Sequence, residues 1–256
     1  MKIVVIGDIH GRNVWEDIIK AESPDQVIFM GDYFDSYNIP GVYQIYNFQN
    51  ILKYAEEHTN TILLIGNHDF HYFKHIGRQK TEGYQGGTFP LVVGEILEEH
   101  KDKFVMAYEH NNIWFSHAGI SPVWLKNCQW EGEPVVYYVN QIWKYKPFWF
   151  AYNTEAPDFG SGNHPVHSPI WIRPYALMKA NRDVFRNEVI QVVGHTHRKK
   201  IDMGISSGGR YYFIDTLSDY GNSQYLCIEN NEFTSKTIKP SVIWQSQRRA
   251  KRSKRS

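Results

Sequence analysis

The chain has 256 residues, of which 42% are hydrophobic and 21% charged, and its net charge at pH 7 is +1. These values are those of a soluble globular protein that is long enough for one large domain with a sizeable core. No apolar run approaches the roughly 20 residues of a membrane helix, which excludes a membrane-spanning protein. The two widely spaced cysteines, Cys128 and Cys227, exclude a disulfide framework and a zinc knuckle. We therefore expect a cytoplasmic protein.

The first third of the sequence alternates short apolar runs with helical patterns. The apolar runs occupy residues 2–7 (KIVVIG), 26–31 (QVIFMG) and 61–66 (TILLIG), and helical patterns begin at Asn13 and extend from about 42 to 58. This alternation predicts βα units with a parallel sheet. The run at the start has only four apolar residues before Asp8, so we interpret it as a first strand and not as a signal peptide.

The middle of the chain changes character after a predicted hairpin. Asn111 and Asn112 separate two apolar runs within residues 102–119, a pattern typical of a β-hairpin. Residues 120–168 are crowded with Trp, Tyr and Phe and then with Gly and Pro, which predicts an inserted lid. We expect the aromatic residues to form the lid's own small core, with an aromatic platform for a base or a peptide as the alternative.

Regular structure resumes after the lid. Residues 170–174 (IWIRP) precede a predicted helix from about 175, a strand over 188–194 and hairpins through 210–216 and 224–238. The last nine residues, 248–256, contain six Lys or Arg and no acid, so the rest of the chain has 22 basic against 27 acidic residues. We predict one domain over 1–247 and a disordered basic tail, either simply solvated or in contact with nucleic acid.

Five predicted strand ends carry polar residues beside a glycine. They are residues 7–11 (GDIHG), 31–35 (GDYFD), 66–69 (GNHD), 116–119 (SHAG) and 194–197 (GHTH). In open α/β sheets, ligands bind at this edge because its loops can carry polar groups that buried strands cannot. A mixed set of Asp, Asn and His without thiolate suits Mn²⁺, Fe²⁺ or Zn²⁺.

The ordered set of five motifs resembles the calcineurin-like metallophosphoesterase superfamily over residues 2–216. The GDIHG, GDYFD and WIRP elements are most similar to the branch of serine/threonine phosphoprotein phosphatases and symmetrical dinucleoside tetraphosphatases. The resemblance implies an α/β fold of two facing mixed sheets flanked by helices, with two divalent metal ions at their edge. We expect Mn²⁺, with Fe or Zn as alternatives.

The resemblance also implies a role for individual residues. Asp32 would bridge the two cations, which together activate water at neutral pH. The first cation would be held by Asp8, His10, Asp32 and His197, and the second by Asp32, Asn67, His117 and His195. His68 would protonate the leaving group, with Asp35 as its orienting partner. Arg173 would bind the phosphate, and Asn67 would also contact the substrate.

Two departures from the branch keep the substrate open. Ser36 stands where the protein phosphatases usually have a phosphate-binding Arg, and the GHTH motif is more typical of phosphodiesterases and nucleases. We predict a phosphoesterase similar to serine/threonine protein phosphatases. The alternatives are a nucleotide or dinucleoside polyphosphate hydrolase and a nucleic-acid phosphatase or nuclease. A non-catalytic scaffold is disfavoured because no predicted ligand or acid is lost.

Three smaller predictions concern neighbouring residues. Asp69 stands where the branch usually has Glu, and we expect it to support its loop. His71 and His75 are four residues apart, and His164 and His167 lie in the lid. Neither pair has a nearby carboxylate or thiolate in the sequence, so we expect surface or lid histidines.

Overall fold

The computed structural model describes residues 1–74, 76, 80, 82–158, 160–180, 185, 189–206, 209–218 and 223–239. The predicted tail at 248–256 lies outside these residues, as does His75. No helix in the described ranges is both long enough and apolar enough to cross a membrane.

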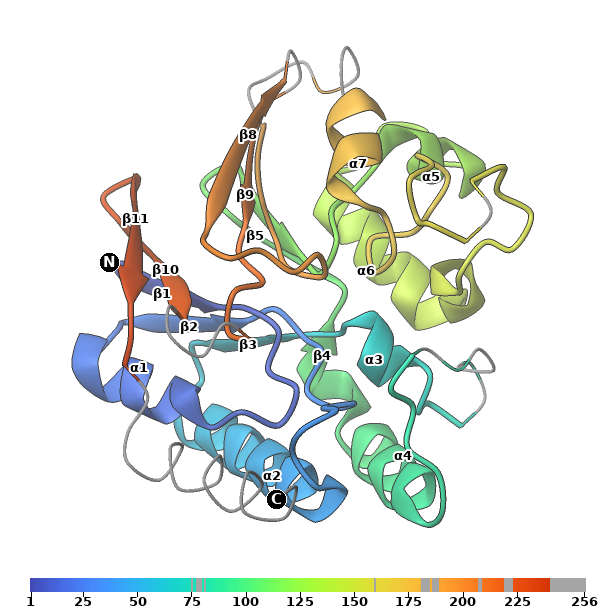
Figure 1. Cartoon of the computed structure of the whole chain (residues 1–256). Helices are drawn as coiled ribbons and strands as arrows, with labels where there is room; N and C mark the ends of the chain where they lie inside the picture. Colours follow the sequence, from blue (N-terminus) through green and yellow to red (C-terminus); the bar gives the residue numbers. More distant parts are fainter. Residues whose placement is uncertain are drawn as a thin grey trace.

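The strands form two mixed sheets, as predicted (Figure 1). In spatial order, the first sheet contains β11 (Glu232–Thr237), β10 (Gln224–Glu229), β1 (Lys2–Ile6), β2 (Gln26–Phe29), β3 (Thr61–Leu64) and β4 (Phe104–Val105). The second contains β5 (Ala107–His110), β6 (Ile113–Ser116), β7 (Val189–Val193), β9 (Gly209–Phe213) and β8 (Asp202–Ser206). Strands β1 to β4 run parallel to one another, and so do β6, β7 and β9.

Helices flank the two sheets. They are α1 (Val14–Glu22), α2 (Gly41–Glu57), α3 (Asn67–Phe70), α4 (Phe89–Glu99), α5 (Pro122–Asn127), α6 (Val135–Tyr145) and α7 (Pro174–Ala180). Two 3₁₀ turns add η1 (Lys101–Lys103) and η2 (Pro147–Phe150). In Figure 1, α1 and α2 lie below the first sheet, whereas α5, α6 and α7 lie beside the second.

Strand β1 shows why the apolar runs are continuous. Ile3 and Val5 pack into the core between the sheets, together with Phe115 and Val192 of the second sheet. Val4 and Ile6 point to the opposite face and pack against the α1 side. Because side chains alternate along a strand, both faces of β1 must be apolar when both are covered.

Two of the three predicted hairpins form at paired asparagines. Asn111 and Asn112 join β5 to β6, and Asn230 and Asn231 join β10 to β11. All four residues have positive φ, between 48° and 64°. Asn tolerates the left-handed region better than most residues, and a two-residue turn of this kind matches the twist of the flanking strands.

The aromatic residues of 120–168 pack differently from the prediction. Trp124, Trp143 and Phe150 belong to the same buried cluster as the strands and helices of the first sheet, so they do not form a separate core. The Trp143 ring lies 5.2 Å from that of Phe73 and 6.3 Å from that of Phe70. These contacts tie the segment to the end of α3, which the sequence pattern could not show because Phe70 and Phe73 lie far away in the chain.

Because α6 packs on the α3 region through one face only, we expect substitutions on that face to lower the stability of the fold more than substitutions on its exposed face. Trp143 is 6% exposed and Tyr145, on the same helix, is 66% exposed. We expect Trp143→Ala to lower the free energy of unfolding by about 3–5 kcal/mol, because it removes a large buried ring. Tyr145→Ala should change it by no more than about 0.5 kcal/mol. Urea unfolding of both variants checks this, and equal losses would contradict the packing described.

Candidate active site

The polar loops meet where the two sheets come together. The chain after β1 pairs with the chain after β2, since His10 N–H donates to the Asp32 carbonyl and Gly11 N–H to the Tyr33 carbonyl. Within the second sheet, Gly194 N–H after β7 donates to the His117 carbonyl after β6 at 2.7 Å. The two sheets are joined by His195 N–H, which donates to the Asp8 carboxylate at 3.1 Å. Side chains from all five motifs are thereby brought to one region.

Two glycines allow this close approach. A Cβ on Gly66 would lie 2.1 Å from Asp32 Oδ1, and one on Gly194 would lie 2.2 Å from Asp8 Oδ1. Any other residue would have to displace a buried carboxylate. Asp32 itself has φ 52° and His195 has φ 62°, in the left-handed region that L-residues seldom adopt. The turns are therefore shaped around the carboxylates.

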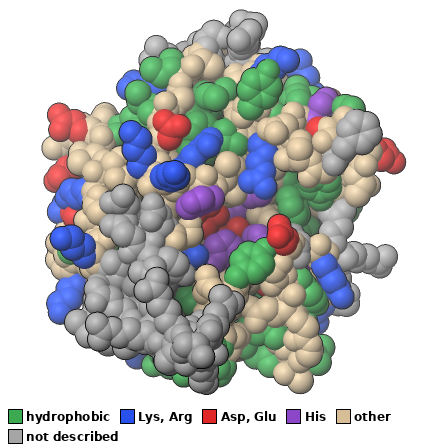
Figure 2. Space-filling model, viewed as in Figure 1, with side chains coloured by type: hydrophobic (Ala, Val, Ile, Leu, Met, Phe, Trp, Pro, Cys, Tyr) green, Lys and Arg blue, Asp and Glu red, His purple; other side chains and the backbone are tan. Residues whose placement is uncertain are grey.

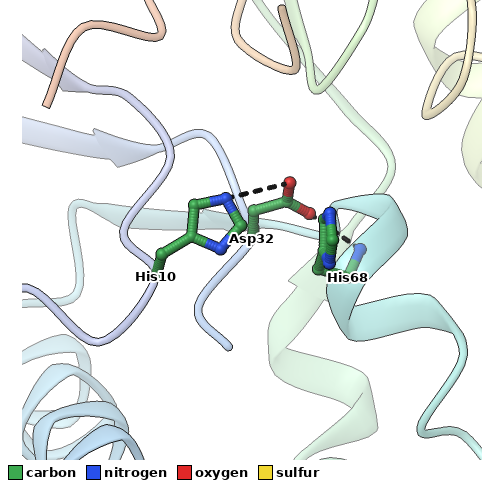
Figure 3. Close-up of side chains that lie close together, drawn as sticks. All are labelled: His10, Asp32 and His68. Carbon is green, nitrogen blue, oxygen red and sulfur yellow. Dashed lines mark hydrogen bonds and ion pairs between the residues drawn. The ribbon is translucent and has the colours of Figure 1, made fainter. Parts of the chain in front are cut away.

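Asp32 lies at the centre of two groups of potential ligands. Within the described part of the chain, one group is His10, Asp32 and His68, and the other is Asp32, His117 and His195. Asp32 Oδ2 lies 3.7 Å from His10 Nε2 and 3.4 Å from His117 Nε2. Asp32 Oδ1 accepts a hydrogen bond from His68 N–H at 2.8 Å. Figure 3 shows the Asp32 carboxylate between the His10 and His68 rings.

Asn67 extends the second group. Its Oδ1 lies 3.0 Å from His117 Nε2 and 2.9 Å from His195 Nδ1. Asn67 is 3% exposed and His117 is completely buried. The amide oxygen and the two imidazoles thus converge next to the Asp32 carboxylate.

The other ring nitrogen of each imidazole faces a backbone carbonyl. His117 Nδ1 lies 2.8 Å from the Met30 oxygen and His195 Nε2 3.1 Å from the Trp171 oxygen, while His10 Nδ1 contacts the Phe34 oxygen. A carbonyl only accepts, so in the neutral ring this nitrogen carries the proton. The nitrogen that faces Asp32 or Asn67 is then unprotonated, and its lone pair points toward a lone pair of the facing oxygen. Such an arrangement fits a divalent cation between them.

The charges lead to the same conclusion. Asp8, Asp32 and Asp215 are all buried, and burial together with the neighbouring Asp215 raises the pKa of Asp8 well above its ordinary value. Burial alone would lower the pKa of His117, but the carboxylates of Asp32 and Asp8 outweigh it and raise that pKa to about 10. The site therefore attracts positive charge, which a proton or a metal ion can supply.

Two predicted ligands lie outside these groups. Asp8 accepts from His195 N–H at 3.1 Å with both carboxylate oxygens. The His197 side chain is exposed, and its Nδ1 lies 2.6 Å from Ser218 Oγ. Their roles as ligands remain predictions.

Asp215 is a buried carboxylate near the site that was not among the predicted residues. It lies two residues after the end of β9 and is 7% exposed, and its charge raises the pKa of Asp8. The signal was present, because residues 210–216 (RYYFIDT) place a carboxylate after an apolar strand. The absence of a neighbouring glycine made the pattern less conspicuous.

The predicted proton donor and its partner are in contact. His68 Nδ1 lies 2.9 Å from Asp35 Oδ2, and the Asp35 side chain is fully buried. Burial alone would lower the pKa of His68, but the carboxylates of Asp32 and Asp35 raise it above the ordinary value. The ring is therefore suited to hold a proton near neutral pH.

Asp69 supports the loops, as predicted. Its carboxylate accepts hydrogen bonds from the backbone N–H groups of Asp32 and Tyr33, both at 2.7 Å, and of Gly66 at 2.9 Å. One buried side chain thus ties the loop after β3 to the loop after β2.

The prediction for His71 was wrong. His71 is 5% exposed, and its Nε2 lies 2.9 Å from Asp35 Oδ2. The carboxylate that the sequence pattern lacked comes from a loop 36 residues earlier. In the lid, His167 is also buried and its Nε2 lies 3.0 Å from Asp158 Oδ2.

Arg173 reaches the edge of the site from the segment before α7. Its Nη1 donates to the His195 carbonyl and to Thr196 Oγ1, both at 3.1 Å. Burial lowers the pKa of Arg173, but the nearby carboxylates oppose that shift, and a guanidinium keeps its charge at any physiological pH. A cation is thus fixed beside the GHTH loop. Figure 2 shows Lys and Arg side chains beside the His and acidic side chains at the centre of this face.

Two mixed sheets with buried carboxylates, imidazoles and an amide at their common edge define a metal-dependent hydrolase of phosphoric esters. The chain belongs to the calcineurin-like phosphoesterase family, whose sequence profile matches residues 1–199. No curated protein sequence matches the chain.

Solved structures show the same fold at low identity. A cold-active protein tyrosine phosphatase of a psychrophilic Shewanella is 17% identical, with a TM-score of 0.59, and the match covers 93% of this chain and 80% of that one. A protein serine/threonine phosphatase from Saccharomyces cerevisiae is 12% identical, with a TM-score of 0.53 and coverage of 94% and 80%. A metallophosphoesterase from Sphaerobacter thermophilus is 14% identical, with a TM-score of 0.50 and coverage of 98% and 94%.

The shared position of Asp32 predicts how metal binding responds to substitution. We expect Asp32→Asn to lower the occupancy of both metal positions, because the carboxylate belongs to both groups. His10→Ala, which removes a member of one group, should lose about one metal ion per chain. Elemental analysis of the purified variants measures this. An unchanged metal content in Asp32→Asn would argue against a shared ligand.

Proposed function

We propose that the chain hydrolyses alkyl phosphate monoesters, as serine/threonine protein phosphatases do, with two divalent cations and a proton supplied by His68. The proposal is carried by the contact of 2.9 Å between His68 Nδ1 and the buried Asp35 carboxylate. An alkoxide is a poor leaving group, so its departure requires a proton donor. A site with a charged and oriented imidazole is suited to this kind of ester.

The predicted ligand set would serve two cations. His10 and Asp32 would hold the first cation together with Asp8 and His197. Asn67, His117 and His195 would hold the second, with Asp32 shared. Two such cations supply an activated water and neutralise the charge of the phosphate. Mn²⁺ suits this set of nitrogen and oxygen ligands, with Fe or Zn as alternatives.

His68 has two possible roles in this arrangement. It belongs to the same group as His10 and Asp32, which would make it a ligand. Its Nδ1 contacts Asp35, so Nε2 is the nitrogen that would donate a proton to the ester oxygen. The Asp35 carboxylate accepts from Nδ1 and thereby keeps the proton-bearing Nε2 in place. We assign His68 as the acid because its Nδ1 is held by a carboxylate. The corresponding nitrogens of His10, His117 and His195, three of the four predicted ligand imidazoles, face backbone carbonyls.

Arg173 would bind the phosphate with its guanidinium. Its two hydrogen bonds to the GHTH loop fix the group beside His195, and charge-assisted bonds to phosphate oxygens are strong. Asn67 would contact the substrate as well as a cation. Ser36 contributes nothing comparable, since its Oγ accepts from the backbone N–H groups of Asn38 and Ile39.

A specific observation favours the polyphosphate alternative. Arg198, Lys199 and Lys200 follow His197 directly, and both lysines are exposed. Such a run next to the site would suit a substrate with a second phosphate, as in a dinucleoside polyphosphate. The leaving group of that substrate is a phosphate anion, which departs without a proton. The role of His68 therefore separates the two functions.

The test compares esters that differ in their need for a proton. We expect His68→Asn to retain both metals and to slow hydrolysis of a phosphoserine peptide by about 10²–10⁴-fold, the usual contribution of a general acid. Hydrolysis of nitrophenyl phosphate should fall much less, because nitrophenolate leaves unaided. Turnover of both substrates and of a dinucleoside tetraphosphate is measured with wild type and variant, alongside metal content.

Three results would speak against this assignment. Equal losses on both esters at full metal content would exclude the acid role. Loss of metal would make His68 a ligand. Fast turnover of the dinucleoside tetraphosphate in wild type, undiminished in His68→Asn and with no activity on phosphoserine, would favour the polyphosphate function.

A further inference from the structure

The Asp35 carboxylate has more partners than its proposed role requires. Its Oδ2 lies 2.9 Å from His68 Nδ1 and also 2.9 Å from His71 Nε2. Its Oδ1 accepts from the Tyr72 hydroxyl at 2.5 Å. The Asp35 side chain is fully buried and that of His71 is 1% exposed. A buried carboxylate is thus held from three sides.

The local sequence explains why these partners converge. His68, His71 and Tyr72 are spaced i, i+3 and i+4, and the turn of α3 continues into His71, which has φ −71° and ψ −11°. Residues at this spacing lie on one face of a helix. That face meets Asp35, which has φ 63° at the end of the loop after β2. Tyr84 packs behind it, with its ring 5.0 Å from that of His71 and 5.2 Å from that of Tyr72.

We infer that His71 is a positioning residue for the proton donor, which acts by anchoring the Asp35 oxygen that accepts from His68. The inference rests on the proposed function, because it needs His68 to be the acid. His71 is buried and contacts Asp35, so it acts through that carboxylate. With Oδ1 held by Tyr72 and Oδ2 held by His71, the carboxylate cannot rotate about its Cβ–Cγ bond. The lone pair of Asp35 Oδ2 that accepts from His68 Nδ1 then points in one fixed direction.

The energetic reason is that catalysis by an acid depends on its orientation. A histidine that donates a proton must keep its ring in one position while the ester oxygen changes charge. An Asp35 carboxylate anchored on one oxygen only could turn away from the ring. Removing a residue that orients a functional side chain from behind typically lowers activity by about 10–100-fold.

Two substitutions of His71, by amide side chains of different length, test the inference. In His71→Gln the longer side chain can place its Nε2 where the imidazole Nε2 lies, so it can keep the contact with Asp35 Oδ2. In His71→Asn the amide is too short to reach. Both variants are polar and uncharged and differ only in reach. His58→Asn, at an exposed histidine of the α2 end, is the control for a neutral change elsewhere.

We expect His71→Asn to lower kcat for a phosphoserine peptide by about 10–100-fold, with KM and metal content unchanged. Its kcat for nitrophenyl phosphate should stay within about threefold of wild type. His71→Gln should restore most of the loss on the peptide. A lower melting temperature alone would not produce this selectivity, since a structural defect affects both substrates. Equal loss on both substrates, no loss in His71→Asn, or equal loss in Gln and Asn variants would overturn the inference.

A double-mutant cycle provides a second measurement. If His71 acts only through Asp35, then His71→Asn should have no further effect on peptide turnover in an Asp35→Asn background. Full additivity of the two losses would overturn the inference. Failure of the proposed function is recognised separately. In that case His68→Asn slows the hydrolysis of both esters equally. If His68→Asn slows peptide hydrolysis selectively and His71→Asn does not, only the role of His71 is refuted.

Discussion

The site depends on one constraint, which is that the Asp32 carboxylate must lie buried among other charged and polar groups. Its Oδ1 accepts from His68 N–H, and its Oδ2 faces His10 and His117. Asp8 and Asp215 add further negative charge nearby. Buried like charges raise the free energy of the folded chain unless a cation compensates them. The loops around Asp32 therefore make structural sense as a cation site.

The protein prepares this site with backbone groups. Carbonyls orient the three imidazoles, and the N–H groups that bond Asp69 hold the loops after β2 and β3 together. Gly66 and Gly194 give the carboxylates the space they occupy. Because these supports belong to strand ends of two packed sheets, the ligands can be in place before metal or substrate arrives. Such preorganisation lowers the cost of binding.

The strands and the five motifs could be predicted because both leave local traces in the sequence. A strand covered on two faces is apolar throughout, and the polar loop that follows stands out against it. Asp69 could be predicted from its place in a motif. The environment of His71 could not, because its carboxylate partner belongs to a distant loop and the contact depends on the turn of α3. The packing of Trp143 on Phe73 could not be predicted for the same reason, because contacts between distant segments leave no periodic pattern of residues in the sequence. Whether Asp8 and His197 bind metal is likewise decided by the positions of side chains from separate loops.

We propose that two cations would share the Asp32 carboxylate. This proposal is tested most directly by a crystal structure of the protein loaded with Mn²⁺, in which anomalous scattering locates the metal. The account predicts two peaks about 3.5–4 Å apart, the usual spacing of paired catalytic metals, one on each side of Asp32. One should lie beside His10 and the other beside Asn67, His117 and His195. A single peak at saturating Mn²⁺, or two peaks that do not both contact Asp32, would contradict it.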